Sequence, residues 1–135
     1  MRILAFIFIP LLSSCVIYLP PAKNQDKRFI RSYQPCQSIP SCEYAMTEII
    51  SENWLRPKGT KDGISVEILL KLNPEGGITS IQVTKQSGSQ LFDMSTLTAI
   101  TKSAPFSELN GLDRADFYRW YGERRIIFKP EDLDN

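Results

Sequence analysis

The side chains of this 135-residue sequence that could do chemistry are carboxylates and cysteines, because the sequence contains no histidine. The commonest general base and the commonest metal ligand are therefore missing. Carboxylates gather at two places: Asp113 and Asp116 lie on either side of Arg114, and residues 131–134 (EDLD) form an acidic tail. Such groups can do acid–base work, but on an exposed helix or at a chain end they usually form a solvated surface. We therefore predict no catalytic, cofactor-binding or metal-binding residue, and an enzyme based on carboxylates is the least favoured function.

The first cysteine, Cys15, follows a segment with the features of an export signal. Met1 and Arg2 give a short basic start, and residues 3–12 (ILAFIFIPLL) form an apolar run too short to span a bilayer as a helix. Residues 12–15 (LSSC) resemble the lipobox of bacterial lipoproteins, in which small residues precede a cysteine that receives a diacylglyceryl group. We expect residues 1–14 to be a lipoprotein signal peptide and Cys15 to be lipidated. The alternatives are an ordinary signal peptide, or a membrane-facing leader with an incidental cysteine.

A lipidated Cys15 would hold the protein on a membrane, since each buried methylene contributes roughly 0.8 kcal/mol. Val16 rather than aspartate follows it, which by analogy with lipoprotein sorting favours the outer membrane. Residues 16–35 contain three prolines and no sustained periodicity, so they are interpreted as a tether. The expected location is the cell envelope, with a lipid anchor in the outer membrane and the folded part facing the periplasm.

The other two cysteines, Cys36 and Cys42, form an even pair, which in an exported protein predicts a disulfide. The bond would close a loop of seven residues (CQSIPSC) and contribute about 2 kcal/mol. Two free thiols or a redox pair are the alternatives, although the five intervening residues do not match a Cys-x-x-Cys motif.

The overall composition is that of an ordinary globular protein, with 42% apolar and 23% charged residues. The formal net charge is +1, and loss of Arg2 with the signal peptide would leave fifteen basic residues against fifteen acidic ones. Because phosphate binding normally needs a basic excess, nucleic acid is not an expected partner.

The best-defined element is a β-hairpin over residues 64–86. Apolar residues occupy every second position of its first strand, namely Ile64, Val66, Ile68, Leu70 and Leu72. Residues 73–77 (NPEGG) suit a turn, and Ile81 and Val83 alternate with polar residues in a second, half-solvated strand. A lone hairpin is only marginally stable in water, so other segments must cover its apolar face.

Helices and a third strand are predicted to provide that cover. One helix is expected to have Ser41 as its N-cap, and a second to span residues 94–103 with Asp93 as its N-cap. Residues 115–121 could form a short helix with two aromatic faces. Residues 126–128 (IIF) are predicted to form an edge strand, because basic residues and a proline flank them.

Four segments together resemble the C-terminal periplasmic domain of TolA, which is related in fold to that of TonB. They are residues 53–57 (NWLRP), 63–88 (GISVEILLKLNPEGGITSIQVTKQSG), 92–100 (FDMSTLTAI) and 124–133 (RRIIFKPEDL). The resemblance implies an α+β fold, a three-stranded antiparallel sheet with helices packed on it. The expected division is a signal peptide (1–14), a lipidated N-terminus with tether and start of the disulfide loop (15–41), and a TolA C-terminal-like domain (42–135).

The same resemblance implies protein binding rather than catalysis. The implied partners are periplasmic proteins of the TolB and Pal type, and also colicin translocation domains and filamentous phage coat domains. Contacts of this kind are commonly made by adding a strand to the edge of a sheet. The edge in this sequence would consist of Arg125, Ile126, Ile127, Phe128 and Lys129.

A full TolA also carries a transmembrane helix and a long helical stalk, whereas here we expect a lipid anchor and a tether of about twenty residues. We therefore expect a stand-alone lipoprotein that binds Tol-Pal components or their ligands. It would support envelope integrity, or modulate the entry of phages or bacteriocins. The alternative is an assembly lipoprotein of another envelope complex, in which the same fold serves for packing.

Overall fold

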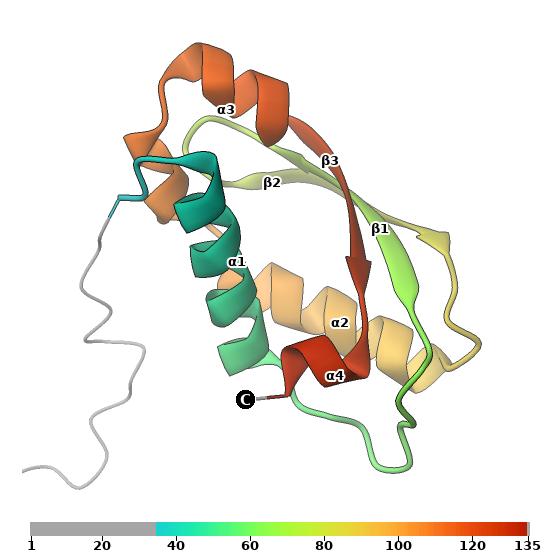
Figure 1. The fold of residues 1–135 in the computed structure, drawn as a ribbon. Helices are drawn as coiled ribbons and strands as arrows, with labels where there is room; N and C mark the ends of the chain where they lie inside the picture. The colour runs from blue at the N-terminus through green and yellow to red at the C-terminus, as the bar shows by residue number, and fades with distance from the viewer. Residues whose placement is uncertain (1–34, 135) are drawn as a thin grey trace, which may run out of the picture. The chain divides into compact units, whose positions relative to one another are not determined.

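The computed structural model describes residues 35–134 (Figure 1). The predicted signal peptide, Cys15 and the tether up to residue 34 lie outside the described residues. The elements are α1 (Ile39–Asn53), β1 (Val66–Leu72), β2 (Ile78–Lys85), α2 (Gln90–Ser103), the short 3₁₀ helix η2 (Ser107–Gly111), α3 (Arg114–Trp120), β3 (Glu123–Phe128) and α4 (Pro130–Leu133). The predicted α+β fold is confirmed.

The three strands form one antiparallel sheet in the order β2-β1-β3. The hairpin strand β1 is therefore central, and β2 and β3 are the edges. Its apolar residues alternate as predicted, because Val66, Ile68, Leu70 and Leu72 are all buried while the residues between them are half-buried. One face of the sheet thus supplies a continuous apolar surface for the helices.

Helices α1 and α2 lie on this apolar face, as Figure 1 shows. The two helices meet where Trp54, just after α1, packs edge to face on Phe92 of α2, with 6.1 Å between the ring centroids. The indole N–H of Trp54 also donates a hydrogen bond to the Ser95 hydroxyl at 2.9 Å. A buried aromatic pair with a satisfied polar group fixes the two helices against each other.

Both long helices begin earlier than the sequence predicts. The N-cap of α1 is Ser38, whose hydroxyl oxygen accepts a hydrogen bond from the Ser41 N–H. In return, the Ser41 hydroxyl oxygen accepts one from the Ser38 N–H. This is a reciprocal capping box, so Ser41 is the third helical residue rather than the cap. The N-cap of α2 is Ser89, whereas the predicted cap Asp93 is helical and buried.

The predicted disulfide between Cys36 and Cys42 is present, with 5.1 Å between the Cα atoms. It joins the residue that enters the domain to the first turn of α1. The Cys36 N–H also donates to the Glu108 carbonyl of η2 at 2.9 Å. The entry point of the chain is therefore held by one covalent bond and one backbone hydrogen bond.

The hairpin turn is fixed against a distant segment through Gly76. This residue has a φ of +82° and its carbonyl accepts from the Phe106 N–H at 2.9 Å. A Cβ at this position would lie 2.3 Å from the Phe106 carbonyl oxygen. Position 76 therefore requires glycine for two reasons: its backbone is left-handed, and another backbone segment approaches it closely.

Replacement of Gly76 by alanine is expected to lower the free energy of unfolding by more than about 2 kcal/mol, because strain and a backbone clash add together. The matched control is Gly88→Ala, since Gly88 has a φ of +90° but nothing within 4 Å of an added Cβ. That control should lose only the strain, about 1–2 kcal/mol. Denaturant unfolding of both variants checks this, and equal losses would contradict the role of the Phe106 contact.

Candidate partner-binding edge

Strand β3 is an edge strand with a regular register. It pairs with β1 through six consecutive residue pairs, from Val66 with Phe128 to Lys71 with Glu123, without a register shift. The structure places the predicted edge residues 125–128 in this strand, and Lys129 one residue beyond it, as the N-cap of α4. An uninterrupted edge is a ready template for a further strand.

The outward-pointing backbone groups of β3 follow from its pairing. The Leu72 N–H donates to the Gly122 carbonyl at 3.2 Å, so Gly122 faces β1. Because antiparallel strands alternate between residues that face the neighbour and residues that face away, Glu123, Arg125 and Ile127 direct their N–H and C=O groups away from β1. A partner strand would therefore bond to the backbones of Arg125 and Ile127.

The side chains of β3 divide between the two faces of the sheet. Phe128 is buried and Ile126 packs against the core, whereas Ile127 is 57% exposed on the opposite face. Ion pairs surround Ile127 on that face: Arg125 lies 3.3 Å from Glu67, and Lys71 lies 3.1 Å from Glu123. Exposed pairs of this kind contribute only about 0–1 kcal/mol each, so a partner could exchange them at little cost.

The start of β3 is locked to α1 through Tyr121 and Arg124. The Tyr121 side chain is buried and its hydroxyl donates to the Ile39 carbonyl at 3.3 Å. The Arg124 guanidinium lies over the Tyr121 ring, 5.2 Å from its centroid, and bonds to Glu43 of α1 at 2.5 Å. These contacts hold one end of the edge strand in place, so the edge is preorganised for pairing.

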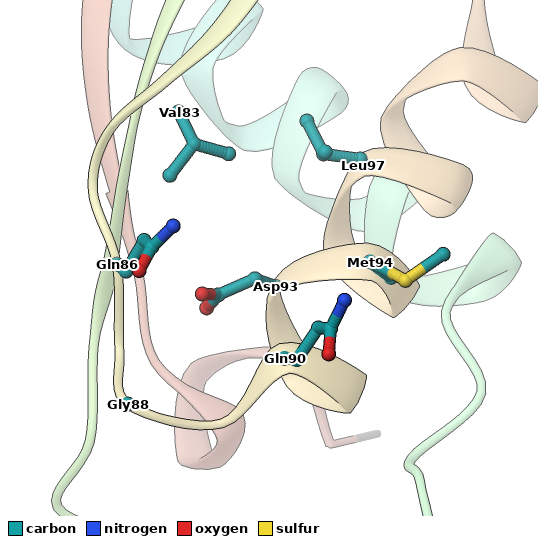
Figure 2. A pocket seen from close by; sticks show the side chains of 7 residues that line it. All are labelled: Val83, Gln86, Gly88, Gln90, Asp93, Met94 and Leu97. Atoms are coloured by element: carbon teal, nitrogen blue, oxygen red, sulfur yellow. The ribbon is translucent and has the colours of Figure 1, made fainter.

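The other edge, β2, is irregular and borders a groove against α2 (Figure 2). Its pairing with β1 has register shifts between Glu67 and Ile68 and between Lys71 and Leu72. The groove has a volume of about 480 Å³ and is lined by Val83, Gln86, Gly88, Gln90, Asp93, Met94 and Leu97. Bulged edges are less suited to pairing than regular ones, so β3 is the better template.

The sequence did not predict this groove, because its existence depends on how α2 packs beside β2. Figure 2 shows Val83 and Leu97 facing each other at one end, with the Asp93 carboxylate directed toward the segment after β2. Both oxygens of Asp93 accept from the Ser87 N–H at 3.2 Å. The buried Asp93 carboxylate therefore stabilises the turn before α2.

Two of the carboxylates that the sequence singled out, Asp113 and Asp134, stabilise the fold. Asp113 is the N-cap of α3 and accepts from the Asp116 N–H at 2.9 Å, while Asp134 forms an ion pair with Arg56. Within residues 35–134, no group of three or more potential ligands could hold a metal ion. In the same part of the chain, no helix is long and apolar enough to cross a membrane.

The described residues form a small α+β domain whose three-stranded sheet has β3 as a regular edge strand. Residues 43–119 match the family described as TonB C terminal, and the chain belongs to this family. No catalytic family is indicated. The predicted resemblance to the TolA C-terminal domain is confirmed by the two relatives that follow.

The chain is 40% identical over 93 residues to the Tol-Pal system protein TolA of Pseudomonas aeruginosa, strain PAO1. The match covers 69% of this chain but 27% of that TolA, so it involves about a quarter of the relative's length. The chain is also similar to a solution NMR structure of TolAIII bound to a peptide derived from the N-terminus of TolB. That likeness has a TM-score of 0.64 and 33% identity, and covers 83% of this chain and 90% of the other.

Tyr121 provides a pH test of how the start of β3 is held. Burial raises the pKa of its phenol above the ordinary 10.0, and the positive charge of Arg124 opposes that shift. The folded state therefore keeps a proton that the unfolded chain releases near pH 10, so stability is full below about pH 10 and is lost as the pH rises through the raised pKa.

The free energy of unfolding should fall more steeply above about pH 10 in the parent chain than in Tyr121→Phe. Denaturant unfolding on both sides of this pH measures the two slopes. The two proteins differ only at residue 121, so the difference between the slopes isolates Tyr121. Parallel pH profiles would contradict the assignment, whereas a constant offset of about 1 kcal/mol would report only the lost hydrogen bond to Ile39.

Proposed function

We propose that this chain is an envelope lipoprotein whose TolA-like domain binds a Tol-Pal-type periplasmic protein by strand addition at β3. The observation that carries the proposal is the regular, outward-facing backbone of Arg125 and Ile127 at the edge of the sheet. It is supported by the similarity to TolAIII, a domain whose structure was determined with a TolB-derived peptide.

The chemistry of this edge fits a peptide partner of modest sequence specificity. Backbone hydrogen bonds would supply affinity, and the exposed Ile127 side chain would set the register. The neighbouring charges of Arg125 and Glu123 would select against strands with like charges at the facing positions. The same edge would be open to colicin translocation domains and phage coat domains, through which the protein would modulate their entry.

The lipid anchor at Cys15 is the second part of the proposal. It rests on the basic start, the apolar run of residues 3–12 and the small residues before the cysteine. The anchor would place the domain in the envelope, with the outer membrane as the proposed site because Val16 follows the cysteine. A binding domain held in this way would retain a Tol-Pal partner near one membrane, in support of envelope integrity.

Proline substitutions at the two edges distinguish the binding strand. Ile127→Pro removes an outward N–H of β3 and should weaken binding of a TolB N-terminal peptide about tenfold or more, since a lost hydrogen bond and a steric block add to roughly 1.4 kcal/mol. The matched variant is Val83→Pro at β2, because Val83 pairs with Ile68, whose backbone groups face β3. The Val83 N–H therefore also points outward, and proline is tolerated at such edge positions.

Calorimetric titration of residues 15–135 carrying Cys15→Ser, which lack the apolar run of residues 3–12 and the acceptor thiol, is the measurement for both variants. Binding that is lost with Ile127→Pro and retained with Val83→Pro supports the β3 edge. The opposite pattern would assign the peptide to β2 and the groove beside α2. Unchanged binding by both variants would contradict strand addition altogether.

Replacement of Cys15 by serine is expected to abolish labelling by fatty acid. The reason is that the thiol is the acceptor of the diacylglyceryl group, whose two chains carry the label, and no hydroxyl replaces it in that chemistry. Mass spectrometry of the parent protein should find an acylated N-terminus at Cys15 and no residues 1–14. An unmodified Cys15, or retention of label in Cys15→Ser, would refute the lipid anchor but would not bear on the proposal for the β3 edge.

A further inference from the structure

Helix α3 exposes two aromatic side chains, one of which, Tyr118, also packs edge to face on Phe117 with 5.5 Å between the ring centroids. It buries Phe117, but Tyr118 and Trp120 are 56% and 45% exposed. They project on either side of an outward-facing Arg119, whose guanidinium lies 5.6 Å from the centroid of the Trp120 ring. Exposed tryptophan and tyrosine beside arginine are the residues that settle at the level of lipid headgroups, with rings in the apolar part and polar groups in water.

The same end of the domain is where the N-terminal segment enters. The Cys36 N–H donates to Glu108 of η2, and Cys36 is so close to Gly111 that a Cβ there would lie 2.1 Å from its carbonyl oxygen. Gly111 ends η2, two residues before the N-cap of α3, Asp113. The fold therefore fixes the entry of the chain beside the aromatic helix.

From these two observations we infer that α3 docks the domain on the phospholipid surface in which Cys15 is anchored. Tyr118 and Trp120 enter the headgroup region, and Arg119 meets the lipid phosphates. The inference rests on the lipid anchor of the proposed function. It adds a second, non-covalent membrane contact that is independent of the partner-binding edge.

The length of the connecting segment favours this occupant. About twenty residues, 15–34, separate the anchor from the entry point, and a chain of that length reaches at most roughly 70 Å. The membrane surface therefore stays within reach of the domain, which raises its effective concentration and favours a contact of weak intrinsic affinity.

Docking through α3 leaves the partner-binding edge free. Strand β3 begins three residues after the end of α3, so in the proposed docking its first residue lies nearest the membrane and Phe128 lies about 17 Å further along the strand. Figure 1 shows α3 at one end of β3 and α4 at the other. Ile127 is thereby presented away from the lipid surface.

The two tryptophans of the sequence make the inference directly measurable, because Trp54 is only 7% exposed and Trp120 is on the proposed surface. The full lipoprotein, purified from envelopes in detergent, is reconstituted into phosphatidylethanolamine and phosphatidylglycerol vesicles with and without brominated acyl chains. Tryptophan emission should be blue-shifted in vesicles and quenched by the brominated lipid.

Two variants assign the signal. In Trp120→Phe the quenching should be lost, and in Trp54→Phe it should be retained, with circular dichroism confirming that both are folded. Sedimentation with the vesicles separates the two proposals: protein that fails to sediment lacks the anchor, whereas anchored protein with unquenched Trp120 overturns the docking of α3. Quenching that persists in Trp120→Phe would overturn it as well.

Discussion

The structure depends on the two-sided pairing of β1. Within the described residues this strand alone has a neighbour on both edges, and its alternate side chains supply the apolar surface on which α1 and α2 pack. Because a three-stranded sheet has one central strand, β2 and β3 must both be edges. The two edges are protected differently, β2 by register shifts and β3 by charged side chains. Charged side chains, unlike register shifts, leave the backbone groups of the edge strand regular and free to pair with a partner strand.

Binding through backbone groups, as proposed above, would tolerate the sequence differences between this domain and its relatives. Identities of 40% and 33% to TolA and TolAIII leave most positions changed. A strand edge keeps its N–H and C=O groups under almost any substitution except proline, provided the apolar alternation of β1 holds the register. The fold therefore restricts the residue type mainly in the core and at positions such as Gly76, where another backbone segment approaches.

The sequence predicts the hairpin, the third strand and both long helices, because their periodicity and breakers are local properties of the chain. It misplaces two N-caps, since several polar residues compete within one turn and only the hydrogen bonds decide between Ser38 and Ser41. The residues of the candidate edge can also be read from the sequence. The sequence does not show which backbone groups of these residues point outward, because that depends on the register between β1 and β3. The groove beside α2 requires the packing of two elements, which no local pattern encodes.

The disulfide at the domain entry has a mechanical meaning. A pull on a partner at the proposed β3 edge, opposed by the proposed anchor at Cys15, would enter the domain at Cys36. Because Cys36 is bonded to Cys42, tension passes across the covalent bridge into the body of α1. The Ser38–Ser41 capping box lies inside the closed ring and carries almost none of it. The first turn of α1 is thus shielded from being unwound by the force that its own anchor would transmit.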